Sequence, residues 1–412
     1  MSTLQESQFW TERQDSARLL FEGYCRIQRE NASFPADTGV LCDESRGSKA
    51  TTMKVAVLTH TEGAHMSAYF SALAEAKDCH EVVLADPNNH WANDAKKTLG
   101  DKLTRTYADH AVLLAKEAPK MCLVSMEAKH ASAVIEAALN SGSHVFAEKP
   151  ACVTLEQFEK LANLAESKHL HLMLAFANRA NPETLTARKM IQQGHIGDIY
   201  SIDMHIVADQ TRLTDPAYHS TWYADKTRAG GGHLIWLGIH WLDLAMHLTG
   251  TTVTQVTGAV VNIGRQPITA EDSAVATLRF SNGMLGTINS GYYLDAGYHT
   301  QIRIWGSKGW VNLDSTGTPK MTWYENAGAN AKQVQTFEGA TEPRGYSPFV
   351  AQVVSAIAED TAPPVTTQES LNALRTVFGI YEAAETGTAT KIDGDRFANG
   401  GQAGHSQTGS AQ

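Results

Sequence analysis

The chain has 412 residues, and this length favours two domains because a single hydrophobic core seldom serves so long a chain. Hydrophobic residues make up 42% of the sequence and charged residues 19%, which fits a globular protein rather than a disordered one. The net charge of -10 argues against broad nucleic-acid binding, and no apolar run reaches the roughly 18 residues that a membrane span needs.

Residues 1–52 differ from the rest of the chain. They are polar and lack a sustained hydrophobic period, although the pattern allows a short amphipathic helix over 17–28. We interpret residues 1–52 as an N-terminal extension, either a simple appendage or an arm that covers a neighbouring subunit or the site. Residues 393–412 are rich in Gly, Ser and Gln, and this composition predicts a disordered tail.

Short apolar strands and amphipathic helices alternate between Met53 and Phe176. The predicted strands cover 54–59, 80–86, 121–125, 144–148 and 170–176. Helical patterns fill the intervals, for example over 130–142 and 154–167. This alternation predicts an α/β domain over 53–176, a Rossmann-type doubly wound parallel sheet with helices on both faces that binds a dinucleotide.

A different pattern follows over 177–392. Longer strands with period-two alternation are predicted over 199–209, 252–263, 273–280, 283–293, 300–306 and 309–314. Glycine-containing tight turns separate several of them, and two closing helices are expected near 347–358 and 367–385. We therefore predict a second α/β domain with a large, open and mostly antiparallel sheet, which binds substrate and supports oligomerisation.

The loop after the first strand is the expected dinucleotide site, since ligands bind at the carboxyl ends of the strands in doubly wound sheets. The usual G-x-G-x-x-G sequence is replaced here by Thr59, Thr61 and Ala64, with Gly63 nearby. The turn could still offer backbone N–H groups and a helix N-terminus to phosphate. The alternative is a loop that has lost nucleotide binding.

Asp86 ends the second predicted strand, about twenty residues beyond this loop. An acid at that place can hydrogen-bond the ribose hydroxyls of NAD and repel a 2′-phosphate. We therefore favour NAD over NADP as cofactor. The alternative is that Asp86 caps the following helix.

The stretch "HVFAEKPACVTLEQFEKLANLA" resembles the Gfo/Idh/MocA family of sugar and polyol oxidoreductases. The preceding "VSMEAKHASAVIEAALNSGS" resembles the segment that leads into the EKP motif of that family. A glycine-led, histidine-bearing helix, "AGGGHLIWLGIHWLDLAMHLTG", and the strands "EDSAVATLRFSNGMLGTI" and "IRIWGSKGWVNLD" also agree. The resemblance extends over roughly 53–392.

The resemblance implies a Rossmann domain that binds NAD(P) and a second domain that closes the substrate site. It assigns Lys149 and His240 as the catalytic acid–base groups. Histidine and a buried lysine suit this role, because alcohol oxidation needs a base poised near neutral pH and a donor for the developing alkoxide. The expected cofactor contacts are Thr59, His60, Gly63, His65, Asp86, Ser125, Met126, His130, Glu148 and Lys149. The expected substrate contacts are Lys149, Tyr223, His233, Trp236 and His240.

One departure from the family pattern concerns the catalytic helix. The family carries an aspartate four residues before the helix histidine, where this chain has Trp236. The indole is only a hydrogen-bond donor, so the carboxylate that would join Lys149 and His240 is missing. Trp236 either packs in the core or gives a sugar ring an apolar wall.

The helix histidines His233, His240 and His247 do not predict a metal site. Their spacing of seven separates neighbours by roughly 10 Å along a helix, too far to share one ion. We expect Asp243, three residues after His240, to orient that imidazole. His233 is either a substrate contact or structural, and His247 is expected to be structural.

The first functional hypothesis is an NAD-dependent oxidoreductase acting on a ring hydroxyl of a sugar, sugar derivative or cyclic polyol. The second is an NAD-dependent glycosidase that works by transient oxidation, elimination, water addition and re-reduction. A non-catalytic binding or regulatory protein is the third. Five cysteines without a C-x-x-C pair and no signal pattern favour a cytoplasmic protein. The open sheet suggests a homo-oligomer, a dimer or tetramer.

Overall fold

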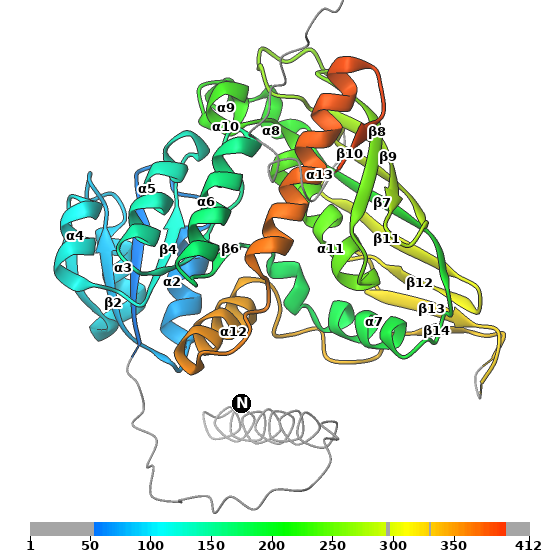
Figure 1. The fold of residues 1–412 in the computed structure, drawn as a ribbon, viewed down its shortest axis with the longest axis horizontal. Helices are drawn as coiled ribbons and strands as arrows, with labels where there is room; N and C mark the ends of the chain where they lie inside the picture. Colours follow the sequence, from blue (N-terminus) through cyan, green and yellow to red (C-terminus); the bar gives the residue numbers. More distant parts are fainter. Residues whose placement is uncertain (1–52, 294–296, 329–330, 393–412) are drawn as a thin grey trace, which may run out of the picture. The chain divides into compact units, whose positions relative to one another are not determined.

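The computed structural model describes residues 53–293, 297–328 and 331–392. These residues form two β-sheets with helices packed around them (Figure 1). The predicted helix over 17–28, the N-terminal extension and the C-terminal tail lie outside the described residues. None of the described helices is both long and apolar enough to span a membrane.

The first sheet is parallel and has six strands in the order β3-β2-β1-β4-β5-β6. The doubly wound sheet predicted from the sequence is therefore confirmed. The strands are β1 (Met53–Thr59), β2 (Cys79–Ala85), β3 (Leu103–Tyr107), β4 (Met121–Ser125), β5 (His144–Ala147) and β6 (Leu172–Leu174). The sequence analysis missed β3, an edge strand whose three central residues are polar and exposed.

The helices of this part are α2 (Met66–Glu75), α3 (Ala92–Leu99), α4 (His110–Glu117), α5 (Ala128–Asn140) and α6 (Leu155–Ser167). They form two groups. Helix α2 contacts α3 in one group, and α5 contacts both α4 and α6 in the other. The late helix α12 (Tyr346–Glu359) packs against α2, although it follows the second sheet in the chain (Figure 1). The C-terminal part of the chain therefore returns to the first sheet.

The second sheet has nine strands in the order β14-β13-β12-β11-β7-β10-β9-β8-β15. Its members are β7 (Ile199–Asp209), β8 (Val253–Val261), β9 (Ser273–Phe280), β10 (Leu285–Tyr293), β11 (His299–Gly306), β12 (Gly309–Leu313), β13 (Met321–Glu325), β14 (Val334–Thr336) and β15 (Thr390–Lys391). Strands β7 and β10 are parallel and the other pairs are antiparallel, as the prediction of a mostly antiparallel sheet requires.

Buried and exposed side chains alternate along the central strands of this sheet, most clearly in β9. In β9, Ala274, Ala276 and Leu278 are buried, whereas Val275 points to the opposite face and is 52% exposed. The buried face packs on α7 (Pro182–Gln192), α11 (Ile239–Thr249) and α13 (Thr367–Thr386) (Figure 1). The opposite face carries exposed apolar side chains at 275, 285 and 305.

Short helices connect β7 to the segment that leads into α11, the helix that carries His240. They are α8 (Thr211–Thr214), α9 (Pro216–His219) and α10 (Lys226–Ala229), with a 3₁₀ turn at Trp222–Ala224 between α9 and α10. Two further 3₁₀ turns lie elsewhere in the described chain, at Gly100–Lys102 and Ala177–Ala180. Helix α10 contacts α5 of the first part. This segment therefore brings side chains from the second half of the chain to the edge of the parallel sheet.

Candidate active site

The catalytic helix begins with an unusual turn. Residues Leu234–Gly238 form one π-helical turn, and α11 continues from it as a regular helix. The buried carboxylate of Glu271 accepts hydrogen bonds from the backbone N–H groups of Gly232 and Leu234, at 2.5 and 3.0 Å. A Cβ on Gly232 would lie 1.9 Å from the Glu271 carbonyl oxygen, so only glycine fits there. The glycine-led start is thus a packing requirement.

Lys149 follows β5 and points at this π turn. Its ammonium donates a hydrogen bond to the Trp236 carbonyl oxygen and lies 3.7 Å from the centroid of the Trp236 indole. A π turn disturbs the regular i→i−4 bonding of a helix, and such turns are frequent at functional sites. Burial lowers the pKa of Lys149 to about 8, although the nearby charge of Glu148 opposes this shift. Lys149 can therefore exchange a proton close to neutral pH.

His240 lies one turn further along the helix and shares a cavity with Lys149. Burial, assisted by the charge of Lys149, holds the pKa of His240 well below its usual value, so its imidazole is neutral. The His240 Nδ1 atom is buried and has no hydrogen-bond partner among the described residues. The ring lies edge-on to Phe176, with centroids 6.0 Å apart.

The cavity has a volume of about 290 Å³. Its walls come from both sheets and the helices between them, and the lining residues are His65, Lys149, Asn178, Ile206, Trp236, Leu237, His240, Trp241, Tyr298, Thr300, Ser315, Thr316 and Tyr346. A larger cavity of about 370 Å³ lies between α6 and α13, but neither Lys149 nor His240 lines it. The smaller cavity holds the groups with perturbed pKa values, and we take it as the candidate active site.

Glu148 is held by tyrosines that the sequence analysis did not identify. Its Oε2 atom accepts hydrogen bonds from the hydroxyls of Tyr69 and Tyr346, the latter at 3.3 Å, and Oε1 accepts the Lys149 N–H at 2.9 Å. The imidazole of His65 lies beside this cluster, 5.1 Å from the Tyr346 ring and 6.3 Å from that of Trp236. The Glu148 carboxylate is therefore fixed 4.0 Å from the Lys149 ammonium.

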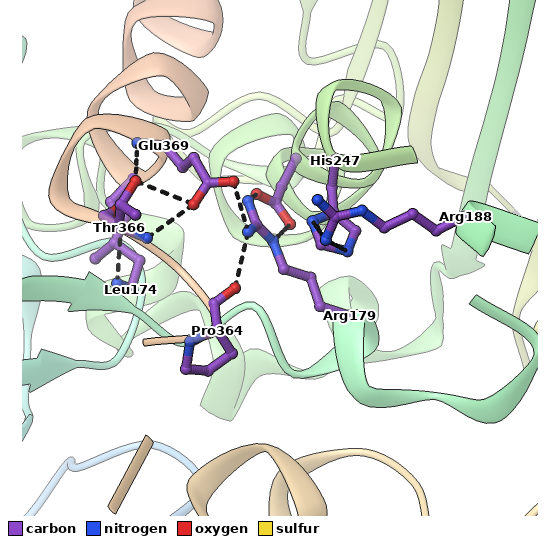
Figure 2. Close-up of polar contacts among 9 residues, drawn as sticks. Leu174, Arg179, Arg188, His247, Pro364, Thr366 and Glu369 are labelled. Atoms are coloured by element: carbon purple, nitrogen blue, oxygen red, sulfur yellow. Dashed lines mark hydrogen bonds and ion pairs between the residues drawn. The ribbon is translucent and has the colours of Figure 1, made fainter. Parts of the chain in front are cut away.

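The structure overturns the expected role of Asp243. Both of its carboxylate oxygens accept hydrogen bonds from Arg179, at 2.9 and 2.5 Å, rather than orienting His240. Figure 2 shows the Arg179 guanidinium surrounded by carboxylate and carbonyl groups, since it also donates to Glu369 and to the Pro364 carbonyl oxygen, both at 3.0 Å. This buried ion-pair network joins α11 to α13.

His247 lies in the same region as this network (Figure 2). Arg188 approaches its ring nitrogens at 3.0 and 3.2 Å, and the imidazole is buried. Burial and the two neighbouring guanidiniums lower the pKa of His247 to about 2. Within the described part of the chain, no group of three or more His, Cys, Asp or Glu side chains could hold a metal ion.

The expected substrate contacts fall into two sets. Lys149, Trp236 and His240 line the candidate active site. Tyr223 packs against Trp236, with ring centroids 4.7 Å apart, and does not line that cavity. His233 is completely buried, with its Nδ1 atom 2.7 Å from the Ser290 hydroxyl and its ring edge-on to Tyr292. Tyr223 is half-buried and lines a separate small cavity beside Trp236, whereas a substrate could reach the buried His233 only after its neighbours moved.

Most of the expected cofactor residues lie in the loops that follow β1 and β4. These two strands are neighbours in the sheet, and the chain leaves them in opposite directions. Thr59 donates a hydrogen bond to the Ser125 carbonyl oxygen, and Ser125 donates to the Ala64 carbonyl oxygen, both at 2.7 Å. A Cβ on Gly63 would lie 2.2 Å from the Thr59 hydroxyl. The two loops are therefore tightly joined beneath the expected position of a pyrophosphate.

Asp86, which is 1% exposed, lies where the ribose of NAD is expected. One carboxylate oxygen accepts the Trp91 backbone N–H at 2.6 Å, near the start of α3, and the other is buried without a hydrogen-bond partner in the described structure. Asp86 therefore fixes the helix start and keeps one oxygen for a further donor, which a ribose hydroxyl would supply. The residues present fit a dinucleotide.

The remaining cofactor residues lie at the same loops. His60 joins them, because its ring nitrogens lie 2.9 and 2.8 Å from the backbone nitrogens of Glu62 and Glu127. Met126 is buried between the loops, whereas His130 is exposed on α5, with its ring 6.3 Å from that of His60. Glu62 and Glu127 were not among the expected site residues.

Two family models match the chain. "Oxidoreductase family, NAD-binding Rossmann fold" matches residues 61–176, and "GFO/IDH/MocA C-terminal domain" matches residues 184–312. Together they span more than half of the sequence and include strands of both sheets. The chain belongs to the GFO/IDH/MocA family. Its first sheet is the NAD-binding Rossmann fold of that family, as the resemblance implied.

Individual relatives agree with this assignment. The myo-inositol 2-dehydrogenase of Thermotoga maritima is 22% identical over 76% of this chain and 90% of its own length. An uncharacterized oxidoreductase of Schizosaccharomyces pombe is 34% identical, but over 35% of this chain and 38% of its own length. The chain thus spans well under two thirds of some curated relatives. A solved levoglucosan dehydrogenase in complex with NADH and levoglucosan has the same fold, with a TM-score of 0.73 and 18% identity over 83% of this chain and all of that one.

Proposed function

We propose that this protein is an NAD-dependent oxidoreductase that acts on a ring hydroxyl of a sugar, sugar derivative or cyclic polyol. The observation that carries the proposal is that Lys149 and His240 line one cavity next to the edge of the NAD-binding sheet. One group can take a proton near neutral pH and the other is a neutral imidazole, which is the pair that alcohol oxidation needs.

When bound, NAD supplies the hydride acceptor. The free amine of Lys149 takes the hydroxyl proton, and its pKa of about 8 makes this amine available near neutral pH. His240 donates an N–H to the developing alkoxide, because its imidazole is neutral and partly exposed to the cavity. Trp236 fixes the position of the Lys149 ammonium through its carbonyl oxygen and its ring.

The cavity suits a small polyhydroxylated ring. Hydroxyl and amide groups of Asn178, Thr300, Ser315 and Thr316 line it, and Trp236 offers an aromatic face. Its volume of about 290 Å³ lies near the lower limit of roughly 300 Å³ for ligand pockets, which favours a single ring over an oligosaccharide. The names of the relatives support this class, since inositol and levoglucosan are polyhydroxylated rings.

Redox-neutral glycoside cleavage is the second candidate. The indole of Trp236 stands where the family carries a carboxylate, so the acid–base groups around Lys149 are rearranged. In this route the ring would be oxidised transiently, elimination would expel the aglycone, and water would add before the ketone is reduced; bound NAD would supply the hydride acceptor and return the same hydride at the end. The two routes differ in whether NADH accumulates.

We further propose that the domains meet near residue 177 and that the open face of the second sheet joins copies of the chain into a dimer or tetramer. Val275, Leu285 and Trp305 are exposed on that face at 52%, 54% and 38%, which is unusual for such large apolar groups on a monomer.

A cytoplasmic location is supported by Cys79, Cys122 and Cys152, which are free thiols.

The test uses the full chain. The purified protein is incubated with NAD and a panel of cyclic polyols, free sugars and aryl glycosides, while NADH and aglycone are followed separately. Stoichiometric NADH supports the dehydrogenase, and aglycone release without net NADH supports the cleavage route. Failure to produce either product with any ring substrate, in protein that binds NAD, would contradict both.

A further inference from the structure

A charged side chain from the second half of the chain reaches the cofactor site. Arg228, on helix α10, donates two hydrogen bonds to the carboxylate of Glu127, from Nε at 2.8 Å and from Nη2 at 2.6 Å. Its Nη2 atom also lies 3.2 Å from the carboxylate of Glu62. Glu62 follows β1 and Glu127 follows β4, so one guanidinium bridges the two loops where a pyrophosphate is expected.

The carboxylates of Glu62 and Glu127 lie where a dinucleotide would place its own negative charge. A pyrophosphate carries two negative charges, and unpaired carboxylates beside it would oppose its binding. The Glu127 side chain is only 5% exposed, so solvent screens its charge poorly. Burial alone would raise the pKa of Glu127, but its hydrogen bonds to Arg228 and the charge of that residue lower the pKa overall and keep the carboxylate ionised.

The same two residues also present backbone donors. The N–H groups of Glu62 and Glu127 both point at ring nitrogens of His60, at 2.9 and 2.8 Å. Burial lowers the pKa of His60, and a neutral imidazole has a single acceptor nitrogen. The ring can therefore accept only one of these N–H groups, and the other is left to donate to a further acceptor such as a phosphate oxygen. The backbone of these residues favours an anion while their side chains repel it.

We propose that Arg228 is the charge-balancing residue of the cofactor site, which neutralises Glu62 and Glu127 so that their loops accept the pyrophosphate of NAD. The affinity for NAD thereby depends on a residue outside the Rossmann sheet. The proposal rests on the NAD-binding first domain and not on the identity of the substrate, so it can fail while the proposed function stands.

The test is a titration of the full-length protein with NADH, followed by the fluorescence of the bound nucleotide in the absence of substrate. Arg228→Met should weaken NADH binding about tenfold, because two carboxylates then lie unpaired near the pyrophosphate. The triple variant Arg228→Met, Glu62→Gln, Glu127→Gln should bind within about threefold of the parent, because the repulsion has been removed with the guanidinium.

Two controls keep the result interpretable. Lys226→Met removes a cation from the same helix, but Lys226 lies near the Tyr381 ring and lines a different cavity, so NADH binding should not change. Glu62→Gln, Glu127→Gln with Arg228 retained should bind NADH at least as tightly as the parent. This variant tests the proposal even if Arg228→Met does not fold.

The proposal predicts that the difference between Arg228→Met and the parent shrinks as salt is added, because counterions screen the partly exposed carboxylate. Unchanged NADH affinity in Arg228→Met would overturn it. A loss of affinity that the two glutamines do not restore would also overturn it, because Arg228 would then act by holding the chain in place rather than by balancing charge.

Discussion

The ammonium of Lys149 lies over the indole of Trp236, 3.7 Å from the ring centroid, and donates to the carbonyl oxygen of the same residue. Both partners are neutral, where the family pattern places a carboxylate. Burial lowers the pKa of Lys149 to about 8, and the Glu148 carboxylate, 4.0 Å from the ammonium, opposes this shift without cancelling it. Trp236 thus positions the proposed base without fixing its charge.

The first prediction concerns Trp236→Asp. A carboxylate beside the ammonium favours the charged form, so the pKa of Lys149 should rise by about one to three units. Because only the free amine accepts a proton, the rate of oxidation should rise with pH through about 8 in the parent and through a higher pH in Trp236→Asp. The measurement is kcat/KM for NADH formation against pH.

Trp236→Phe is the control for this change, since it keeps an aromatic face and the backbone carbonyl. In Trp236→Phe, the pH at which kcat/KM rises to half of its maximum should stay within about half a pH unit of that in the parent. If kcat/KM rises over the same pH range in Trp236→Asp as in the parent, Lys149 is not the group whose titration limits the reaction.

A second prediction concerns the buried ion pair between Arg179 and Asp243. Asp243→Asn leaves a buried guanidinium without its main carboxylate, and this should lower the free energy of unfolding by about 3–5 kcal/mol. Urea unfolding measures the effect. Glu369→Gln is the matched control, because Glu369 is 39% exposed and should cost about 1 kcal/mol or less.

The pH dependence of the reaction separates the two possible roles of Asp243. If it acts by pairing with Arg179, the folded Asp243→Asn enzyme should keep the pH profile of the parent. A shifted profile at unchanged stability would instead indicate that Asp243 acts on His240, which the structure contradicts.

A third prediction concerns cofactor choice. Asp86→Asn keeps an acceptor for the Trp91 N–H but removes the negative charge from the oxygen that has no partner. NADH binding should weaken about tenfold, and the discrimination against NADPH should fall, because a 2′-phosphate is no longer repelled. Fluorescence titrations with the two nucleotides measure both effects. Unchanged affinity for both would leave Asp86 with only its role at the start of α3.

A fourth prediction concerns assembly. Leu285 is 54% exposed on the open face of the second sheet, so Leu285→Lys should weaken association of the chains. Light scattering coupled to size exclusion should then report a smaller particle for the variant than for the parent. The same change in charge at an exposed polar position, Gln192→Lys at the end of α7, should leave the particle size unchanged. Equal sizes for parent and Leu285→Lys would argue against this face.

The sequence predicts most of the fold because buried strands and helix faces carry periodic apolar residues. It misses β3, β14 and β15, which are edge strands that are short or polar, and β13, which lies next to the edge and has weak periodicity. The glycine-led helix was expected, but its π turn depends on packing against Glu271, which local patterns do not reveal.

The sequence also does not predict contacts between residues that are far apart in the chain. Asp243 was assigned to His240 because the two are three residues apart, but its partner Arg179 lies 64 residues earlier. The tyrosines that hold Glu148 come from α2 and α12, and nothing near the EKP motif indicates them. Arg228 was one of several charged residues in its loop, and only the fold identifies its two carboxylate partners.

The central claim is that Lys149 and His240 oxidise a ring hydroxyl with NAD. The most direct measurement is the NADH formed from myo-inositol, levoglucosan and simple glucosides by the parent and by Lys149→Ala. The parent should form NADH in proportion to substrate consumed, and Lys149→Ala should be slower by about 10²–10⁴-fold while still binding NADH. Full activity in Lys149→Ala, or no NADH from any ring polyol in NAD-bound parent protein, would contradict the claim.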